Sequence, residues 1–209
     1  MSEHQLNEMN NTAIIIVAAG SASRFGSIKQ LLHFNNKTLL QHAIDEGIDA
    51  GAGSVIVVTG AHADEILKNI NHEQVEVVHN ENWQQGIASG IVAGVQKAID
   101  LNNNVEKIII AVCDQPFVSS SLFKQLYQKQ EEGVQHIVAS AYADTIGTPV
   151  LFTQKYFDAL LGLKGDEGAK KILKTNIDDV ATVDFPQGAI DIDTQKDFDD
   201  LLDRQKHVL

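Results

Sequence analysis

Short apolar runs alternate along this chain with longer segments in which apolar residues recur every three or four positions. β-Branched runs of about four to eight residues predict strands, and the longer period predicts helices. The predicted strands are Ala13–Ala18, Ser54–Thr59, Val75–His79, Lys107–Val112, His136–Ser140, Pro149–Phe152 and Ala181–Asp184. The predicted helices are Leu39–Ala50, Asp64–Asn71, Ile87–Leu101, Leu122–Glu131, Gln154–Leu161, Glu167–Lys174 and Thr194–Gln205. This alternation predicts an α/β fold, an open and mostly parallel sheet between two layers of helices.

Two predicted strands are apolar at every position, Ile14–Val17 and Ile108–Val112. This pattern is typical of central parallel strands, which are buried on both faces. Ligands of open α/β sheets bind beyond the carboxyl ends of such strands. We therefore expect the chemistry in the residues that follow Val17 and Val112.

Length and composition favour a single globular domain. The 209 residues contain no internal repeat or low-complexity linker, and a chain of this length can bury a full core. We expect residues 1–11 to form a flexible tail and residues 12–209 one domain. The longest apolar run, Ala13 to Ala19, is far shorter than the roughly 20 residues of a membrane span. The one cysteine, Cys113, fits a reducing compartment, so the cytoplasm is the expected location.

Acidic residues outnumber basic ones, 28 to 16, and the formal net charge is −12. Nucleic acids and anionic membranes require a cationic face, so we expect neither as a partner. A small polyphosphate is not excluded, because a few local cations, backbone N–H groups and a metal can bind it.

The first predicted strand leads into a turn of small residues. Its sequence is Ala18-Ala19-Gly20-Ser21-Ala22-Ser23-Arg24-Phe25-Gly26, and Lys29 follows. Small residues let successive N–H groups approach a polyphosphate, to which Arg24 and Lys29 would add charge. An ordinary strand–helix turn with two solvated cations fits the same pattern.

Two familiar phosphate-binding motifs do not fit this turn. A P-loop has four residues between its glycines and then Lys-Ser/Thr, whereas five separate Gly20 from Gly26, and Ser27 follows. The dinucleotide fingerprint requires glycine where this chain has Ala22. The spacing therefore disfavours both a P-loop and a nicotinamide-binding turn.

Acidic residues follow the second apolar strand and precede the last predicted helix. Asp114 comes directly after Val112-Cys113, where it could bind Mg²⁺ or simply cap a turn before Pro116. Asp191 and Asp193 would face the same way in an extended segment and could supply a second carboxylate, or they could decorate the helix start. Thr194, with Asp197 three residues later, predicts an acidic variant of the capping box. Cys113 fits a small buried hydrophobe better than a nucleophile.

The segment after the third strand contains the single tryptophan. Trp83 fits a packing anchor, while Gly86 and Ser89 could lie against a base or ribose. The eight histidines form no metal-ligand pattern.

Taken together, these segments resemble the molybdenum cofactor cytidylyltransferase group of the MobA-like nucleotidyltransferases. The resemblance runs from Ile14 to about Leu202. The residues that carry it are Ala18-Ala19-Gly20, Arg24, Gly26, Lys29-Gln30-Leu31-Leu32, Asp114-Gln115-Pro116, Asn80, Trp83, Gly86, Ser89, Gly147, Pro149, Leu151-Phe152, Gly165-Asp166, Gly168-Ala169 and Asp191-Ile192-Asp193-Thr194. The resemblance implies a three-layer Rossmann-like fold of the nucleotide-diphospho-sugar transferase type. It departs at Ala22 (commonly Ser or Gly), Gln195 (commonly Pro) and Lys170 (commonly Arg).

The resemblance also implies an activity: CTP and the molybdenum–molybdopterin cofactor give the cytosine dinucleotide form of the cofactor and pyrophosphate. Ala19 looks like the cytidylyl version of a position that is usually glycine in guanylyl relatives. Lys29, Arg24 and Asp114 are then the catalytic residues, and Asp114 with Asp193 or Asp191 would hold Mg²⁺. The implied substrate-binding residues are Ala18, Ala19, Gly20, Gly26, Asn80, Gly86, Ser89, Gln115, Gly147 and Asp166. A molybdenum enzyme that accepts the product, or its chaperone, is the implied protein partner.

Three alternatives remain open from the sequence. Another nucleoside triphosphate could be the donor, with a sugar or alcohol phosphate as acceptor. The chain could instead be an NAD(P)-dependent oxidoreductase, or a carrier that binds the pterin without catalysis.

Overall fold

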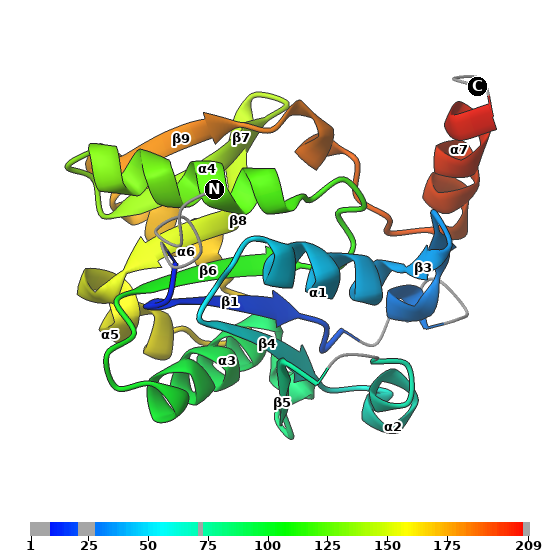
Figure 1. Cartoon of the computed structure of the whole chain (residues 1–209), viewed down its shortest axis with the longest axis horizontal. Coiled ribbons are helices and arrows are strands. Elements are labelled where there is room, and N and C mark those ends of the chain that lie inside the picture. Colours follow the sequence, from blue (N-terminus) through cyan, green and yellow to red (C-terminus); the bar gives the residue numbers. More distant parts are fainter. Residues whose placement is uncertain (1–8, 21–27, 71–72, 207–209) are drawn as a thin grey trace, which may run out of the picture.

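A computed structural model describes residues 9–20, 28–70 and 73–206. Its main sheet has seven strands in the order β5-β4-β1-β6-β8-β7-β9 (Figure 1). The strands are β1 (Thr12–Val17), β2 (His33–Phe34), β3 (Lys37–Thr38), β4 (Ser54–Thr59), β5 (Val75–His79), β6 (Lys107–Val112), β7 (Ile137–Tyr142), β8 (Thr145–Thr153) and β9 (Val180–Asp184). The α-helices are α1 (Leu39–Asp49), α2 (Ala63–Leu67), α3 (Ile87–Leu101), α4 (Ser120–Glu132), α5 (Phe157–Leu161), α6 (Ala169–Thr175) and α7 (Gln195–Lys206). The short 3₁₀ turns are η2 (Lys29–Leu31), η3 (Trp83–Gln85), η4 (Gln154–Tyr156), η5 (Ile177–Asp179) and η6 (Pro186–Ala189).

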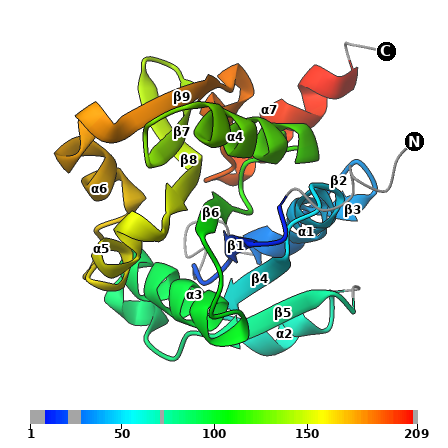
Figure 2. The same cartoon turned by 60° about the vertical axis from the view of Figure 1, so that its left-hand side comes forward.

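Helices cover both faces of the sheet, as the all-apolar strands predict. Along β1, Ile15 packs into a core with α3, α5 and α6, while Ile14 and Ile16 pack into a second core with α1 and α4. The turned view separates these two helical layers (Figure 2). The prediction of a three-layer α/β fold is confirmed.

The sheet is mostly parallel, and β8 is its antiparallel strand, paired with β6 and β7. The predicted strand Pro149–Phe152 is only the inner part of β8, which begins at Thr145. Ala143 and Asp144, both at positive φ, connect β7 to β8. The sequence does not reveal this tight hairpin because alanine rarely adopts the left-handed conformation.

A second small sheet, the β2–β3 hairpin, was not predicted. Asn35 and Asn36 at its turn have φ values of 51° and 65°, which suit a two-residue hairpin turn. The hairpin packs with α7 in a third apolar cluster that includes Phe34, Ile192 and Phe198. Strands of two residues carry too little alternation to be recognised from the sequence.

The element boundaries differ from the prediction where capping residues decide them. The helix expected from Leu122 begins at Ser120, because the Ser119 hydroxyl accepts the Leu122 N–H at 3.2 Å. The predicted capping box at α7 is confirmed: Thr194 N donates to the Asp197 carboxylate at 2.7 Å, and Asp197 N donates to Thr194 Oγ1 at 3.2 Å.

Part of the predicted tail is packed against the body. Met9 is buried, and its carbonyl accepts the N–H groups of Thr12 and Gly53. Residues 1–8 lie outside the described residues. No helix in the described part of the chain has both the length and the apolar character of a membrane span.

The topology switches at β1. The chain places β4 on one side of β1 and β6 on the other, both parallel to it. The carboxyl ends of β1 and β6 therefore open side by side, which is where ligands bind in this class of sheet.

Candidate functional site

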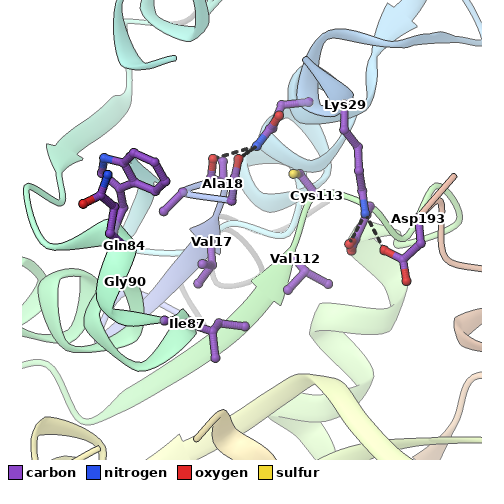
Figure 3. A pocket seen from close by; sticks show the side chains of 15 residues that line it. Val17, Ala18, Lys29, Gln84, Ile87, Gly90, Val112, Cys113 and Asp193 are labelled. Carbon is purple, nitrogen blue, oxygen red and sulfur yellow. Dashed lines mark hydrogen bonds and ion pairs between the residues drawn. The ribbon is translucent and has the colours of Figure 1, made fainter. Parts of the chain in front are cut away.

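A cavity of about 550 Å³ opens at these two carboxyl ends. Its walls come from the turn after β1, from η2, from the segment around η3 and α3, from the end of β6, and from the segment before α7. The lining residues are Val17, Ala18, Ala19, Gly20, Lys29, Gln30, Trp83, Gln84, Gly86, Ile87, Gly90, Val112, Cys113, Asp114 and Asp193. Gln84 and Ile87 lie across the cavity from Lys29 and Asp193 (Figure 3).

Lys29 lies between two carboxylates on one side of the cavity. Its Nζ is 2.8 Å from Asp114 Oδ2 and 2.8 Å from Asp193 Oδ1. Burial by itself lowers the pKa of Lys29, but the nearby charges and hydrogen bonds of Asp114 and then Asp193 outweigh it, so that its pKa is raised. The ammonium group therefore remains charged at neutral pH.

The segment before α7 reaches this site because one buried residue anchors it. Ile192 is fully buried in the cluster of α7 and the hairpin, and its N–H donates to the Asp114 carbonyl at 3.1 Å. Asp193 then contacts Lys29. Asp191 does not line the cavity. Its burial and the nearby charges of Asp193 and Asp114 raise the pKa of its carboxyl group.

The donor set fits a hard divalent cation with few protein ligands. No cluster of three His, Cys, Asp or Glu side chains suited to a metal occurs among the described residues. Asp114 and Asp193 instead share one cation, the Lys29 ammonium. Mg²⁺ is commonly held by one or two carboxylates together with substrate phosphates and water, so this pair fits such an ion when a triphosphate is present.

The described part of the turn after β1, Ala18 to Gly20, lines the cavity, and Gln30 braces it. Gln30 Nε2 donates to the Ala18 carbonyl at 2.9 Å and to the Gly20 carbonyl at 3.0 Å. The predictions at Arg24 and Gly26 lie outside the described residues. The role of Gln30 was not predicted, although it directly follows Lys29.

Asn80 and Ser89 do not line the cavity; they brace the loop that does. Asn80 Nδ2 donates to Ser89 Oγ at 2.8 Å, and Asn80 Oδ1 accepts the Asn82 N–H at 3.0 Å. The Ser89 hydroxyl lies 2.8 Å from the Gly86 carbonyl. These bonds fix the η3 turn, which carries Trp83 and Gln84 into the cavity wall.

Gly86 packs against the segment that contains Asp166, a predicted substrate-binding residue. Its φ is +99°, and a Cβ there would collide with the Gly165 carbonyl and lie 2.5 Å from Asp166 Oδ1. The Ala88 N–H donates to the same Gly165 carbonyl at 3.1 Å. Asp166 is thus placed beside the cavity wall without being part of the cavity lining.

Gln115 and Gly147 lie outside the cavity lining. Gln115 Nε2 donates to the Gly188 carbonyl at 3.2 Å. A Cβ on Gly147 would collide with the Tyr142 hydroxyl and approach the Lys170 side chain.

Cys113 lines the cavity next to Asp114 but is unsuited to nucleophilic attack. Burial, followed by the Asp114 charge, raises the pKa of its thiol to about 12. A protonated thiol agrees with the prediction that Cys113 is a small apolar residue.

Comparisons with known proteins agree with this geometry. Residues 14–180 match the MobA-like NTP transferase domain. A relative from Paenarthrobacter nicotinovorans, named nicotine blue oxidoreductase, is 28% identical over 169 residues, 77% of this chain and 80% of that protein. The molybdenum cofactor cytidylyltransferase of Escherichia coli is 22% identical over 185 residues, 88% of this chain and 92% of that protein.

A solved structure shares the fold. The manganese complex of a Mycobacterium tuberculosis protein superposes with a TM-score of 0.73 at 25% identity, covering 92% of this chain and 97% of that one. The seven-stranded sheet with its switch point at β1, the cavity there and the family match lead to one conclusion: this chain belongs to the MobA-like NTP transferase family and is a nucleotidyltransferase with the Rossmann-like fold of nucleotide-diphospho-sugar transferases.

Proposed function

We propose that this enzyme transfers a cytidylyl group from CTP to the terminal phosphate of the molybdenum–molybdopterin cofactor and releases pyrophosphate. The observation that carries the proposal is the Lys29 ammonium held between Asp114 and Asp193 at the cavity. This arrangement offers both a cation for phosphates and a carboxylate pair for a divalent metal. In this proposal residues 12–209 are one domain, with the nucleotide bound by its N-terminal part and the acceptor by its C-terminal part.

In the proposed reaction an acceptor phosphate oxygen attacks the α-phosphorus of CTP in line. The new P–O bond forms as the bond from the α-phosphorus to the bridging oxygen breaks, and that oxygen leaves with pyrophosphate. A phosphate monoester is already an anion near neutral pH, so the step needs no general base. The enzyme therefore acts by alignment and charge compensation.

Two groups of residues divide this work. Lys29, with Arg24, stabilises the charge that develops on the α-phosphate and the leaving pyrophosphate. Asp114 and Asp193 would hold Mg²⁺, which supplies further charge compensation for the triphosphate. Gly147, Gln115 and Asp166, which lie outside the cavity lining, are proposed to bind substrate.

The choice of CTP is supported by Ala19. Ala19 lines the cavity, at a position where the resemblance gives alanine in cytidylyl relatives and usually glycine in guanylyl relatives. The molybdenum cofactor cytidylyltransferase among the relatives supports the same donor and acceptor.

A thermal-shift panel of CTP, GTP, UTP and ATP with Mg²⁺ tests the donor. A ligand at a hundredfold excess over its Kd stabilises the folded state by about 2.7 kcal/mol, so CTP should give the largest shift. Pyrophosphate release with labelled CTP and the molybdenum cofactor then tests the transfer. A larger shift and faster release with GTP would overturn the choice of CTP.

The name of the Paenarthrobacter nicotinovorans relative calls for one more assay. Hydride transfer is followed with NADH and NADPH on the same preparation. Turnover in that assay without pyrophosphate release in the first would favour the oxidoreductase alternative.

A further inference from the structure

The side chain of Gln30 is buried in the wall of the cavity. It is not one of the reacting groups proposed above. It is 4% exposed, and its carboxamide bonds two carbonyl oxygens of the turn after β1, those of Ala18 and Gly20. Two such bonds from one nitrogen span the turn from its first residue to its third. Dashed lines in Figure 3 mark hydrogen bonds to the backbone beside Ala18.

The orientation of a carbonyl also fixes the N–H on the same peptide unit. Because the peptide bond is planar and trans, its C=O and N–H point in opposite directions. The bond from Gln30 to the Ala18 carbonyl therefore turns the Ala19 N–H away from Gln30. Ala18, Ala19 and Gly20 all line the cavity, so a donor in this turn can face a bound nucleotide.

The turn η2 links this brace to the charged side of the cavity. Lys29 and Gln30 are adjacent, and backbone bonds from Leu31 N to Ile28 O and from Leu32 N to Lys29 O close the turn. Lys29 contacts the end of β6 through Asp114, and Gln30 contacts the end of β1 through the Ala18 carbonyl. The two halves of the switch point are thus held together by neighbouring side chains.

We propose that Gln30 is a positioning residue for the nucleotide: its carboxamide holds the Ala18 and Gly20 carbonyls on its own side and so presents the Ala19 N–H to the donor nucleotide. This inference rests on the proposed nucleotide site but not on which base the site prefers. A residue with this role acts on ground-state binding, because the bond it presents exists before the reaction begins. Its loss should raise KM and leave kcat nearly unchanged.

The test compares Gln30→Met, which keeps length and removes the donor, with Gln30→Asn, which keeps a carboxamide too short to span both carbonyls. Gln125→Met is the matched control, because Gln125 is exposed on α4 and bonds only Ser121 among the contacts of the described residues. Amide hydrogen exchange of residues 18–20 is measured without nucleotide. Kd, KM and kcat are then measured with the triphosphate that stabilises the wild type most.

For Gln30→Met we expect faster exchange at residues 18–20, and Kd and KM raised about tenfold, as the loss of one hydrogen bond predicts, with kcat changed less than about twofold. Gln30→Asn should change KM in the same direction by less, and it keeps the test decisive if the methionine variant folds poorly. Gln125→Met should change none of these quantities. Unchanged exchange and KM in both Gln30 variants would overturn the proposal, as would a fall in kcat with KM unchanged.

The outcomes for Gln30 and for the proposed function are distinct. A wild type that prefers GTP overturns the choice of CTP, while the Gln30 measurements proceed with GTP. The exchange measurement requires no nucleotide, so it tests the brace independently of any activity.

Discussion

At the scale of single residues, the charged side of the cavity balances one cation against two anions. The Lys29 side chain is 13% exposed and lies 2.8 Å from each carboxylate, Asp114 and Asp193. Two carboxylates that both lie this close to the same position repel each other unless a cation occupies that position. Either an ammonium or a divalent metal can fill that role, so metal binding and the position of Lys29 are coupled.

The first prediction concerns Lys29→Met. Without its ammonium the two carboxylates are uncompensated, so Mn²⁺ should bind the nucleotide-free variant more tightly than the nucleotide-free wild type. Turnover should fall by about 10²–10³-fold, the usual effect of losing one charge contact to a transition state. Calorimetric titration with Mn²⁺ checks the binding. Lys37→Met is the control, since Lys37 pairs with Asp45 outside the cavity lining; tighter Mn²⁺ binding in that variant as well would contradict the coupling.

The second prediction concerns Asp114→Ala. Asp114 follows the buried strand β6, and its carboxylate is not part of the core. The variant should therefore fold like the wild type. Pyrophosphate release at saturating Mg²⁺ should fall by about 10²–10³-fold. Circular dichroism verifies the fold, and a coupled pyrophosphate assay gives the turnover. Normal turnover in a folded variant would remove Asp114 from the proposed metal site.

At the scale of elements, the sequence predicts what local pattern determines. All seven strands of the main sheet and the capping box of α7 follow from apolar runs and from Thr194 with Asp197. The convergence of the ends of β1 and β6 follows from the rule for open sheets. What local pattern does not determine is the contact of Lys29 with Asp193, which depends on the packing of Ile192 and α7 against the unpredicted β2–β3 hairpin.

The same limit applies to the residues that brace the site. Asn80 and Ser89 are predicted to bind substrate, and in the structure the Asn80 amide donates to the Ser89 hydroxyl. A sequence indicates that a polar residue lies near a site without showing which way its side chain points. The brace by Gln30 was missed for the same reason.

The third prediction belongs to the loop contact at Gly86. In Gly86→Ala an alanine has to adopt a φ near +99°, and its Cβ collides with the Gly165–Asp166 loop. The substitution should therefore lower the free energy of unfolding by about 2–4 kcal/mol. Nucleotide affinity should fall too, because Gly86 lines the cavity. Gly51→Ala separates the two causes: its φ is +81°, with no atom within 4 Å of the added Cβ. It should cost only about 1 kcal/mol. Urea denaturation measures both, and equal losses would show that the loop contact contributes nothing.

At the scale of the whole molecule, a polar cluster at the other end of the sheet from the cavity joins three segments. Asp179 in η5 accepts hydrogen bonds from the His136 amide at 3.0 Å, the Lys155 ammonium at 2.8 Å and the Tyr156 hydroxyl at 2.7 Å. His136 precedes β7, which runs parallel to β9, and Lys155 follows β8. The cluster therefore fixes the β8–β7–β9 side of the sheet without contact with the cavity lining.

The fourth prediction follows from the ionisation of this cluster. Burial alone would raise the pKa of Asp179, but the bonds from Lys155, the His136 amide and Tyr156 outweigh it and lower the pKa to about 2, against an ordinary value of 3.8. A depressed folded-state pKa contributes stability that is present above the unfolded-state value and is lost as the pH falls through the folded-state value. The stability of the wild type should therefore exceed that of Asp179→Asn at pH 7, and the difference should shrink between about pH 4 and pH 2.

Urea denaturation at several pH values measures that difference. Asp178→Asn is the control, because it removes the same charge from the adjacent exposed position and leaves the three bonds to Asp179 intact. At pH 7 the stability difference between Asp178→Asn and the wild type should be smaller than that between Asp179→Asn and the wild type. Because the cluster lies away from the cavity, KM and kcat of Asp179→Asn should match those of the wild type at temperatures where both are folded. A stability difference that stays constant down to pH 2 would show that the loss in Asp179→Asn comes from packing and not from the ionised carboxylate.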